Sequence, residues 1–162
     1  MKHLYIMRHA EAEDLETGGD DAERPLTKRG RKAARAMGRW ITGQGISPEV
    51  IATSPLKRAM QTARAVRKAM AGPKPMLIPE LAGECPAKDL AVSLMPVFEG
   101  AETVLVVGHQ PQLAQLVSLL VTGGIYGRFD LKKGSLCRIE METLLPAKCG
   151  SLDLVVTPES IR

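Results

Sequence analysis

A chain of 162 residues is long enough to bury a substantial core and too short for two ordinary domains, so residues 1–162 are predicted to form a single domain. Hydrophobic residues make up 44% and charged residues 25%, close to globular averages, which excludes a disordered chain. The net charge of +4 would permit nucleic-acid binding, but one tryptophan, two tyrosines and two phenylalanines are too few for a base-stacking platform. No nucleic-acid partner is expected.

The expected location is the cytoplasm, without a membrane partner. Arg8 and Glu11 interrupt the amino terminus, so it offers no signal-peptide apolar region, and no stretch approaches the roughly twenty apolar residues of a membrane span. The cysteines are Cys85, Cys137 and Cys149, an odd number without metal-ligand spacing. This pattern indicates reduced thiols in a cytoplasm.

Strands and helices are predicted to alternate along most of the chain. The expected strands are residues 4–7, 50–52, 76–78 and 103–107, and the expected helices are residues 27–43, 55–71, 87–98 and 111–121. Thr27 and Ser54 are the expected N-caps. Alternation of this kind implies right-handed crossovers and a sheet covered on both faces. The predicted fold is a three-layer α/β/α sandwich with a mostly parallel central sheet.

The last part of the chain has a different pattern. Residues 136–142 and 152–156 alternate polar and apolar side chains around Pro146 and Gly150, which is typical of a hairpin. We expect this hairpin at one edge of the sheet, so at least one strand should be antiparallel.

Chemically capable residues follow three of the apolar strands. Arg8 and His9 come after residues 4–7, Arg58 follows residues 50–52, and His109 follows residues 103–107. In open α/β sheets, active sites form at the carboxyl ends of the strands, where backbone amides are free and neighbouring loops converge. Two arginines and two histidines are therefore expected in one crevice. His3 stands apart and is predicted to be structural.

These residue types suit phosphoryl transfer. The planar forks of Arg8 and Arg58 match phosphate oxygens. A neutral imidazole can attack phosphorus while a protonated one donates to a phosphate oxygen, and His9 with His109 fits these two roles. Gln110 is expected to add its backbone amide to phosphate binding at the start of the following helix. The scheme needs no metal ion and no cofactor.

Three motifs in this order resemble the histidine phosphatase superfamily, formerly named for phosphoglycerate mutase. They are Arg8-His9-Ala10-Glu11, the run from Ser54-Pro55 through Arg58 to Thr62-Ala63, and Val107-Gly108-His109. Glu23-Arg24-Pro25-Leu26-Thr27 with Gly30 looks like the small bacterial phosphohistidine phosphatases of the SixA type. The resemblance runs from about Lys2 to about Leu120 and makes the chain one catalytic domain of this kind.

The resemblance implies a covalent mechanism. His9 would attack phosphorus to form a phosphohistidine enzyme intermediate, and water would then release inorganic phosphate while Arg8, Arg58 and His109 hold the group. Arg24 is expected either to reach the crevice rim or to order its loop. The acidic loop of residues 14–23 is predicted to be solvated.

The general acid departs from the family pattern. Glu80 matches the acid of many relatives in one alignment, whereas alignment on Leu81 gives Leu81-Ala82-Gly83 and no acid; Glu84 is the other nearby carboxyl group. A second branch of the superfamily uses an Asp directly after its second histidine, where this chain has Gln110. An alkoxide leaving group needs a proton donor, but a protonated phosphoramidate expels neutral imidazole.

The sequence therefore predicts a metal-independent phosphatase that acts on phosphohistidine in a partner protein. Only 50 residues separate Arg58 from His109, which leaves little room for a lid and favours an open crevice. Two alternatives remain at this point. One is a phosphatase of small phosphate esters with the same fold, and the other is a non-catalytic phosphate-binding module, against which the presence of His9 counts.

Overall fold

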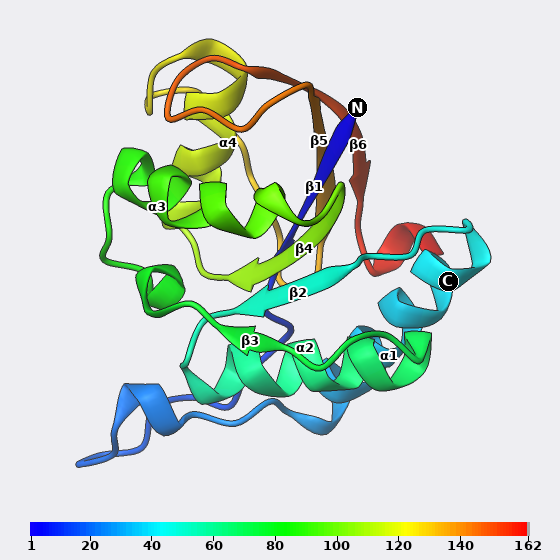
Figure 1. Ribbon diagram of the computed structural model, residues 1–162. Coiled ribbons are helices and arrows are strands. Elements are labelled where there is room, and N and C mark those ends of the chain that lie inside the picture. The colour runs from blue at the N-terminus through cyan, green and yellow to red at the C-terminus, as the bar shows by residue number, and fades with distance from the viewer. Residues whose placement is uncertain (162) are drawn as a thin grey trace.

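One six-stranded sheet forms the centre of the molecule, and the computed structural model describes residues 1–161 (Figure 1). Its strands are β1 (Lys2–Arg8), β2 (Val50–Thr53), β3 (Met76–Leu77), β4 (Thr103–Gly108), β5 (Leu136–Met141) and β6 (Gly150–Val156). Their order across the sheet is β3-β2-β4-β1-β5-β6. Strands β1 to β4 run parallel to one another, whereas β5 pairs antiparallel with both β1 and β6. This confirms the mostly parallel sheet with an antiparallel hairpin at one edge.

Four helices cover the two faces of this sheet, and they are α1 (Lys28–Gly43), α2 (Lys57–Met70), α3 (Ala87–Leu94) and α4 (Gln112–Thr122). Helices α1 and α2 pack on one face and α3 and α4 on the other (Figure 1). Successive side chains of a strand point to opposite faces, so Leu4 and Ile6 enter the core under α3 and α4, and Tyr5 and Met7 enter the core under α1 and α2. The three-layer prediction is confirmed.

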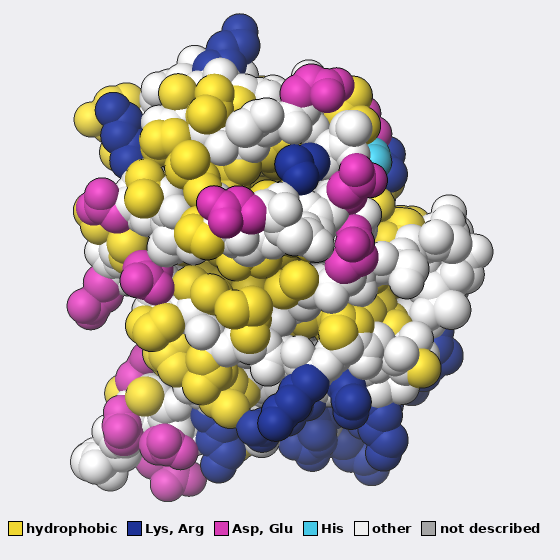
Figure 2. Space-filling view, in the orientation of Figure 1, with side chains coloured by type: hydrophobic (Ala, Val, Ile, Leu, Met, Phe, Trp, Pro, Cys, Tyr) yellow, Lys and Arg dark blue, Asp and Glu magenta, His cyan; other side chains and the backbone are white. Residues whose placement is uncertain are grey.

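Helix α1 forms where its apolar pattern and its cap agree. Ala34, Met37 and Ile41 recur at helical spacing and are buried against the sheet. The Thr27 hydroxyl accepts a hydrogen bond from the Gly30 amide at 2.9 Å, as predicted for an N-cap. The opposite face of α1 carries arginines and lysines, and cationic side chains gather over α1 and α2 in Figure 2.

Two helix boundaries differ by two or more residues from the prediction. Helix α3 ends at Leu94 and continues as a short 3₁₀ segment, Met95–Glu99, because Pro96 has no amide hydrogen to extend an α-helix. Helix α2 begins at Lys57 with Leu56 as its N-cap, so Ser54 does not cap it. The Ser54 hydroxyl instead accepts a hydrogen bond from the Leu56 amide at 3.1 Å, in the turn before the helix.

Further short 3₁₀ segments occur at Asp21–Glu23, Pro79–Ala82 and Glu159–Ile161. The first lies in the loop after β1, and the second follows β3. In residues 1–161 no helix combines the length and apolar character needed to cross a membrane.

The register of the central strands determines where the site lies. Parallel strands β1 and β4 pair Arg8 with Gly108, and β2 and β4 pair Thr53 with Val107. The residues that follow these pairs leave the sheet side by side at its carboxyl edge. His9, Ser54 and His109 are therefore neighbours.

Candidate active site

His9 and His109 lie next to each other at the carboxyl edge of the sheet. Their ring centroids are 5.2 Å apart with a tilt of 52° between the ring planes. His9 is 6% exposed and His109 is 5% exposed, so both imidazoles are largely shielded from water. The structure thus brings the two predicted histidines together, as expected for residues that follow neighbouring parallel strands.

The hydrogen bonds of His9 orient its ring. Its Nδ1 lies 2.7 Å from the Ala10 carbonyl oxygen, which only accepts, so Nδ1 carries the hydrogen in this contact. A neutral His9 then has its lone pair on Nε2. The next residue is also held, because the Ala10 amide donates to the Thr62 hydroxyl at 3.1 Å and that hydroxyl donates to the Arg58 carbonyl at 2.7 Å. These bonds connect the end of β1 to the first turns of α2.

His109 is held between β2 and α4. Its Nε2 lies 2.7 Å from the Ser54 hydroxyl, and its carbonyl accepts a hydrogen bond from the Leu113 amide at 3.0 Å. Its Nδ1 is buried and has no hydrogen-bond partner within residues 1–161. Ser54 was predicted from the sequence only as a helix cap, and its contact with His109 is a role that the sequence reasoning missed.

Burial and nearby positive charge lower the pKa of both histidines, so both imidazoles are neutral at pH 7. Burial lowers the pKa of His9 from 6.5 to about 4, and the nearby charges of Arg58, Arg8 and Arg24 add to this effect. Burial and the proximity of His9 and Arg58 lower the pKa of His109 from 6.5 to about 3. Protonation of His109 when phosphate is bound stays a prediction.

Arg8 lies half-buried at the end of β1. One terminal nitrogen of its guanidinium donates to the Leu131 carbonyl at 3.1 Å, and its backbone amide donates to the Ser135 carbonyl at 3.1 Å. Its Nε is buried and has no partner within the described residues. Burial lowers the pKa of Arg8, although the guanidinium remains charged at any physiological pH.

Arg58 reaches the site from the first turn of α2. Its terminal nitrogens donate to the backbone carbonyl of Asp21 at 2.9 Å and to the Asp21 carboxylate at 3.2 Å. Its Nε has no partner in the described part of the chain, and the side chain is 8% exposed. The two arginines thus approach the histidines from different elements, and each has a buried Nε donor that makes no hydrogen bond within the described residues.

The loop of residues 14–24 folds onto Arg58, which the sequence reasoning missed. Most of the loop is exposed as predicted, but the Asp21 carboxylate accepts hydrogen bonds from Arg58 and, at 2.8 Å, from Arg24. These cationic donors hold the pKa of Asp21 below its ordinary value, although partial burial acts in the opposite direction. The one feature of the sequence that indicates part of this arrangement is the spacing of three residues between Asp21 and Arg24, which suits an ion pair between them.

Arg24 combines the two roles that the sequence left open. Its guanidinium orders the loop by donating to Asp21 and, at 3.1 Å, to the Glu13 carbonyl. It also lies close enough to His9 for its charge to contribute to the lowered pKa of that imidazole. Arg24 is therefore at the rim of the crevice.

Gln110 lies beside the site, ahead of the helix. Helix α4 begins at Gln112 with Pro111 as its N-cap, so Gln110 precedes the first turn, and its side-chain oxygen accepts a hydrogen bond from the Ala114 amide at 2.9 Å. The side chain is thus used to cap the helix. Phosphate binding by its backbone amide stays a prediction.

The described residues contain no group of three or more His, Cys, Asp or Glu side chains arranged to hold a metal ion. The three cysteines of this part of the chain form no disulfide, and burial raises the pKa of the Cys137 thiol to about 12.

Comparisons with known proteins agree with this geometry. A family model described as the histidine phosphatase superfamily, branch 1, matches residues 4–82. Phosphohistidine phosphatase SixA of Escherichia coli K12 is 34% identical over 123 residues, which cover 74% of each chain. An uncharacterised protein of a Picosynechococcus strain is 33% identical over 137 residues, which cover 82% of this chain and 81% of that protein. The chain belongs to the histidine phosphatase superfamily.

Its whole fold is also that of a SixA-type member. A solved structure of the protein histidine phosphatase SixA, complexed with tungstate, superposes with a TM-score of 0.85 at 27% identity and covers 99% of both chains. The protein is therefore a SixA-type phosphatase of this superfamily. The match to branch 1 agrees with the prediction from Gln110, which disfavoured the branch that carries an Asp at that position.

No carboxyl group of residues 78–85 forms a hydrogen bond or an ion pair with His9 or His109 of this SixA-type phosphatase. Gly83, which aligns with the family acid when the segment is aligned on Leu81, lies beside His109: a Cβ atom added to Gly83 would be 3.9 Å from the His109 Cβ. Its φ of 112° also favours glycine. Glu84 is exposed, and Glu80 contributes its backbone carbonyl to a hydrogen bond from Gln112 at 2.6 Å.

Proposed function

We propose that this phosphatase removes phosphate from phosphohistidine in a partner protein, through a covalent phosphohistidine intermediate on His9. The observation that carries the proposal is the orientation of His9. Because its Nδ1 hydrogen is donated to the Ala10 carbonyl, the neutral ring presents the lone pair of Nε2, and the lowered pKa of about 4 keeps that lone pair free at pH 7. A free imidazole lone pair is the nucleophile that attack on phosphorus requires.

Arg8, Arg58 and His109 are proposed to bind the transferred phosphoryl group. Phosphoryl transfer depends mainly on positioning and on neutralising the charge of the non-bridging oxygens. The Nε atoms of Arg8 and Arg58 and the Nδ1 atom of His109 are buried nitrogens without partners in residues 1–161, so they are available to phosphate oxygens. The related SixA structure holds tungstate, an oxyanion.

The phosphate itself would supply the charge that His109 needs. Burial, His9 and the nearby arginines lower the pKa of His109 to about 3. A phosphate dianion between the arginines offsets that positive charge and favours the imidazolium form. His109 then donates a hydrogen bond to the phosphoryl group, and water that attacks phosphorus at His9 releases inorganic phosphate.

The missing proton donor favours phosphohistidine over phosphate esters. Ester cleavage by this route expels an alkoxide, which needs a general acid, whereas a protonated phosphoramidate expels a neutral imidazole. Gly83 has no side chain at the place beside His109, and neither Glu80 nor Glu84 forms a hydrogen bond or an ion pair with a histidine of the site. The SixA relative of Escherichia coli is itself a phosphohistidine phosphatase.

We further propose that residues 1–162 act as a single catalytic domain on a phosphoprotein partner in the cytoplasm. One sheet and the two cores on its faces include residues from β1 to β6. The segment between Arg58 and His109 forms most of α2, then β3, α3, short 3₁₀ turns and β4, with no long loop to cover the crevice. Such a crevice admits a histidine side chain that projects from another protein. The free cysteines suit a reducing compartment.

The test compares a phosphohistidine-bearing phosphotransfer domain with a panel of small phosphate esters. We expect the purified enzyme to release phosphate from the protein with a kcat/KM at least about 100-fold higher than for any alkyl ester, since a general acid contributes roughly 10²-fold or more. Faster turnover of a sugar phosphate or nucleotide would favour the small-ester phosphatase. Saturable phosphate binding without turnover of any substrate would favour the non-catalytic module.

A further inference from the structure

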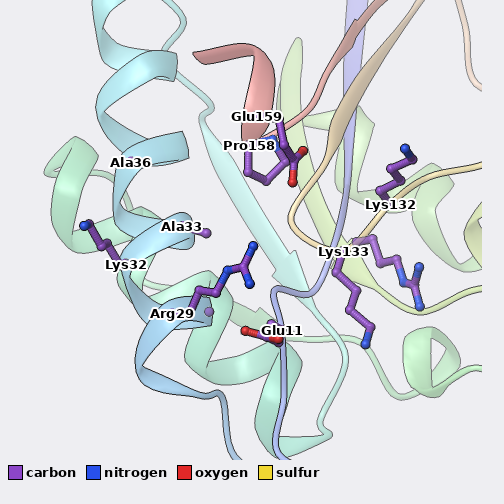
Figure 3. A pocket seen from close by; sticks show the side chains of 11 residues that line it. Glu11, Arg29, Lys32, Ala33, Ala36, Lys132, Lys133, Pro158 and Glu159 are labelled. Atoms are coloured by element: carbon purple, nitrogen blue, oxygen red, sulfur yellow. The ribbon is translucent and has the colours of Figure 1, made fainter. Parts of the chain in front are cut away.

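A groove of about 820 Å³ opens beside the candidate site (Figure 3). Arg29, Ala33 and Ala36 of α1 line one side, and Lys132 and Lys133 of the loop before β5 line the other. Arg8, which directly precedes His9, also lines the groove. Its volume is in the range of about 300–1,000 Å³ typical of ligand sites. The groove therefore leads from an open surface to the catalytic edge of the sheet.

Positive charge dominates this groove. Its lining contains five cationic side chains, from Arg8, Arg29, Lys32, Lys132 and Lys133, and two carboxylates, from Glu11 and Glu159. The Glu11 carboxylate accepts a hydrogen bond from the Thr27 hydroxyl at 3.0 Å. Within residues 1–161, Arg29, Lys132 and Lys133 form no ion pair and no side-chain hydrogen bond, although they come from segments far apart in the sequence. Their charges are available to a negatively charged partner.

Small residues of α1 keep the groove hollow. Gly30, Ala33 and Ala36 line it, so no long side chain of the helix fills the space between the cations. Gly30 also permits close packing of α1 on the chain after β1, because a Cβ at this position would lie 2.1 Å from the Glu11 carbonyl oxygen. The result is a concave surface, unlike the convex face that solvated charges of an amphipathic helix usually occupy.

Several cationic side chains of α1 lie at its N-terminus, where positive charge destabilises a helix. Lys28, Arg29, Arg31 and Lys32 are among the first five residues of α1, and its first turn has no acidic residue. Positive charge at a helix N-terminus is destabilising because it faces the positive end of the helix dipole. Arg31 makes a hydrogen bond to the Leu26 carbonyl at 2.8 Å, but Arg29 makes none. Local rules broken without a local gain are expected at functional surfaces.

We propose that this groove docks an acidic segment of the phosphoprotein substrate, next to its phosphohistidine. The proposal rests on the proposed function, since it assigns the partner of the same site. A chain segment suits the groove better than a nucleotide, because none of the eleven lining residues is aromatic and the groove offers no surface for base stacking. Exposed lysines around an open groove can pair with a series of spaced carboxylates. Arg8 lines both this groove and the phosphoryl site, so a segment bound in the groove would lie next to that site.

The kinetic test uses the double charge reversal Arg29→Glu with Lys133→Glu. A phosphotransfer domain with acidic residues around its histidine is phosphorylated chemically, and phosphoramidate serves as the small substrate. We expect kcat/KM for the protein to fall by about tenfold or more and kcat/KM for phosphoramidate to change by less than about twofold. Added salt should lower the wild-type rate on the protein and leave the rate on phosphoramidate unaltered.

The matched control is Arg35→Glu with Arg39→Glu, which makes the same charge change at exposed positions of α1 outside the groove. This variant should retain the wild-type rate on both substrates. Arg29→Glu places an acid in the first turn of α1, so the test variant should melt at the wild-type temperature or above it. A loss of docking in a variant of undiminished stability cannot be attributed to unfolding.

A binding test does not depend on the substrate. Fluorescence anisotropy measures the binding of a fluorescein-labelled peptide of Glu, Asp and Ser residues. We expect the wild type to bind this peptide saturably, the test variant to bind it with about tenfold lower affinity, and the control variant to bind it as the wild type does. The docking proposal is overturned if the wild type does not bind the peptide or if both variants bind it equally. It is also overturned if the double charge reversal lowers the rate on phosphoramidate as much as the rate on the protein. Displacement of the peptide by inorganic tripolyphosphate at concentrations well below the peptide's own Kd would likewise contradict it. If the wild type binds the peptide but leaves the phosphoprotein intact, the proposed function fails and the docking site stands.

Discussion

The crevice around His9 and the basic groove beside it contain the same kinds of cation in opposite environments. In the crevice, Arg58 is 7% exposed and the two histidines are 6% and 5% exposed, so the charge of Arg58 acts in a space with little water. In the groove, Arg29, Lys132 and Lys133 are exposed. Exposed charges are screened by water and salt, whereas buried charges interact strongly. Burial thus determines whether a charged side chain takes part in the chemistry or in the association with a partner.

The largest expected effect is that of removing the nucleophile from the crevice. His9→Ala should lower the single-turnover rate by at least about 10⁴-fold and retain most of the affinity for orthophosphate, because the arginines and His109 remain. Rapid-quench labelling of the wild type with a phosphorylated substrate should trap phosphate on His9. Label on a cysteine or serine, or activity that survives in the alanine variant, would contradict the proposed mechanism.

The next effect concerns the buried arginine of α2. Arg58→Gln should lower kcat/KM by about 10²–10³-fold, because the removal of one preorganised donor to the transition-state oxyanion typically has this effect. Arg64→Gln is the matched control, since Arg64 is exposed on the same helix, and it should leave kcat/KM unchanged. Equal rates for the two variants would show that the environment of Arg58 does not distinguish it from a surface arginine.

The pH dependence of stability tests whether the crevice is as dehydrated as the geometry implies. The folded-state pKa values of about 4 for His9 and about 3 for His109 lie below the ordinary value of 6.5, so the unfolded chain binds more protons in the interval between. The stabilisation is fully present above about pH 6.5 and is lost as the pH falls. For each histidine, the free energy of unfolding should fall by about 1.4 kcal/mol for each unit by which the pH falls between its ordinary pKa and its folded-state pKa.

Urea denaturation at a series of pH values between about 4.5 and about 8 measures this slope. The double variant His9→Asn, His109→Asn is the control, and its stability should depend less steeply on pH. Saturating orthophosphate should reduce the slope in the wild type, because the anion favours the imidazolium form of His109. Equal slopes for the wild type and the double variant would mean that the histidines are solvated.

A smaller effect is expected at the contact between the acidic loop and the crevice. Asp21 presents its carboxylate to Arg58 at 3.2 Å, where a phosphate oxygen would compete for the same guanidinium. Asp21→Asn retains an acceptor of similar shape and removes the negative charge, so orthophosphate should inhibit the variant at about two- to fivefold lower concentration. Glu23→Gln, in the same loop, is the control. Weaker inhibition in Asp21→Asn would show that Asp21 assists phosphate binding by orienting Arg58.

The smallest expected effect is at the carboxyl groups outside the crevice. Glu80→Gln and Glu84→Gln should leave single-turnover cleavage of phosphohistidine within about twofold of the wild type, because neutral imidazole departs without a general acid. The ratio of this rate to that for an ester with a poor leaving group should also stay constant. An equal, large loss on both substrates in Glu80→Gln would identify a general acid and make the small-ester phosphatase the better interpretation.

The central strands and the residues that follow them are predictable from the local sequence pattern alone. Apolar runs before Arg8-His9 and Gly108-His109 predict buried parallel strands, and strands of this kind end at a common edge. The local pattern was therefore sufficient to place the histidines together, and the observed register of Arg8 with Gly108 does so. The edge hairpin was also predictable, because alternation of side chains is a local property of each strand.

The surroundings of these residues depend on contacts between segments that are distant in the sequence. The contacts of Asp21 with Arg58, of Ser54 with His109 and of Thr62 with Ala10 join segments between 37 and 55 residues apart in the sequence. Local spacing carries no information about such pairs, which form when helices and loops pack on the sheet. The lowered pKa values of the histidines and the groove between α1 and the loop before β5 have the same origin, since desolvation and concavity are produced by the packing of distant segments.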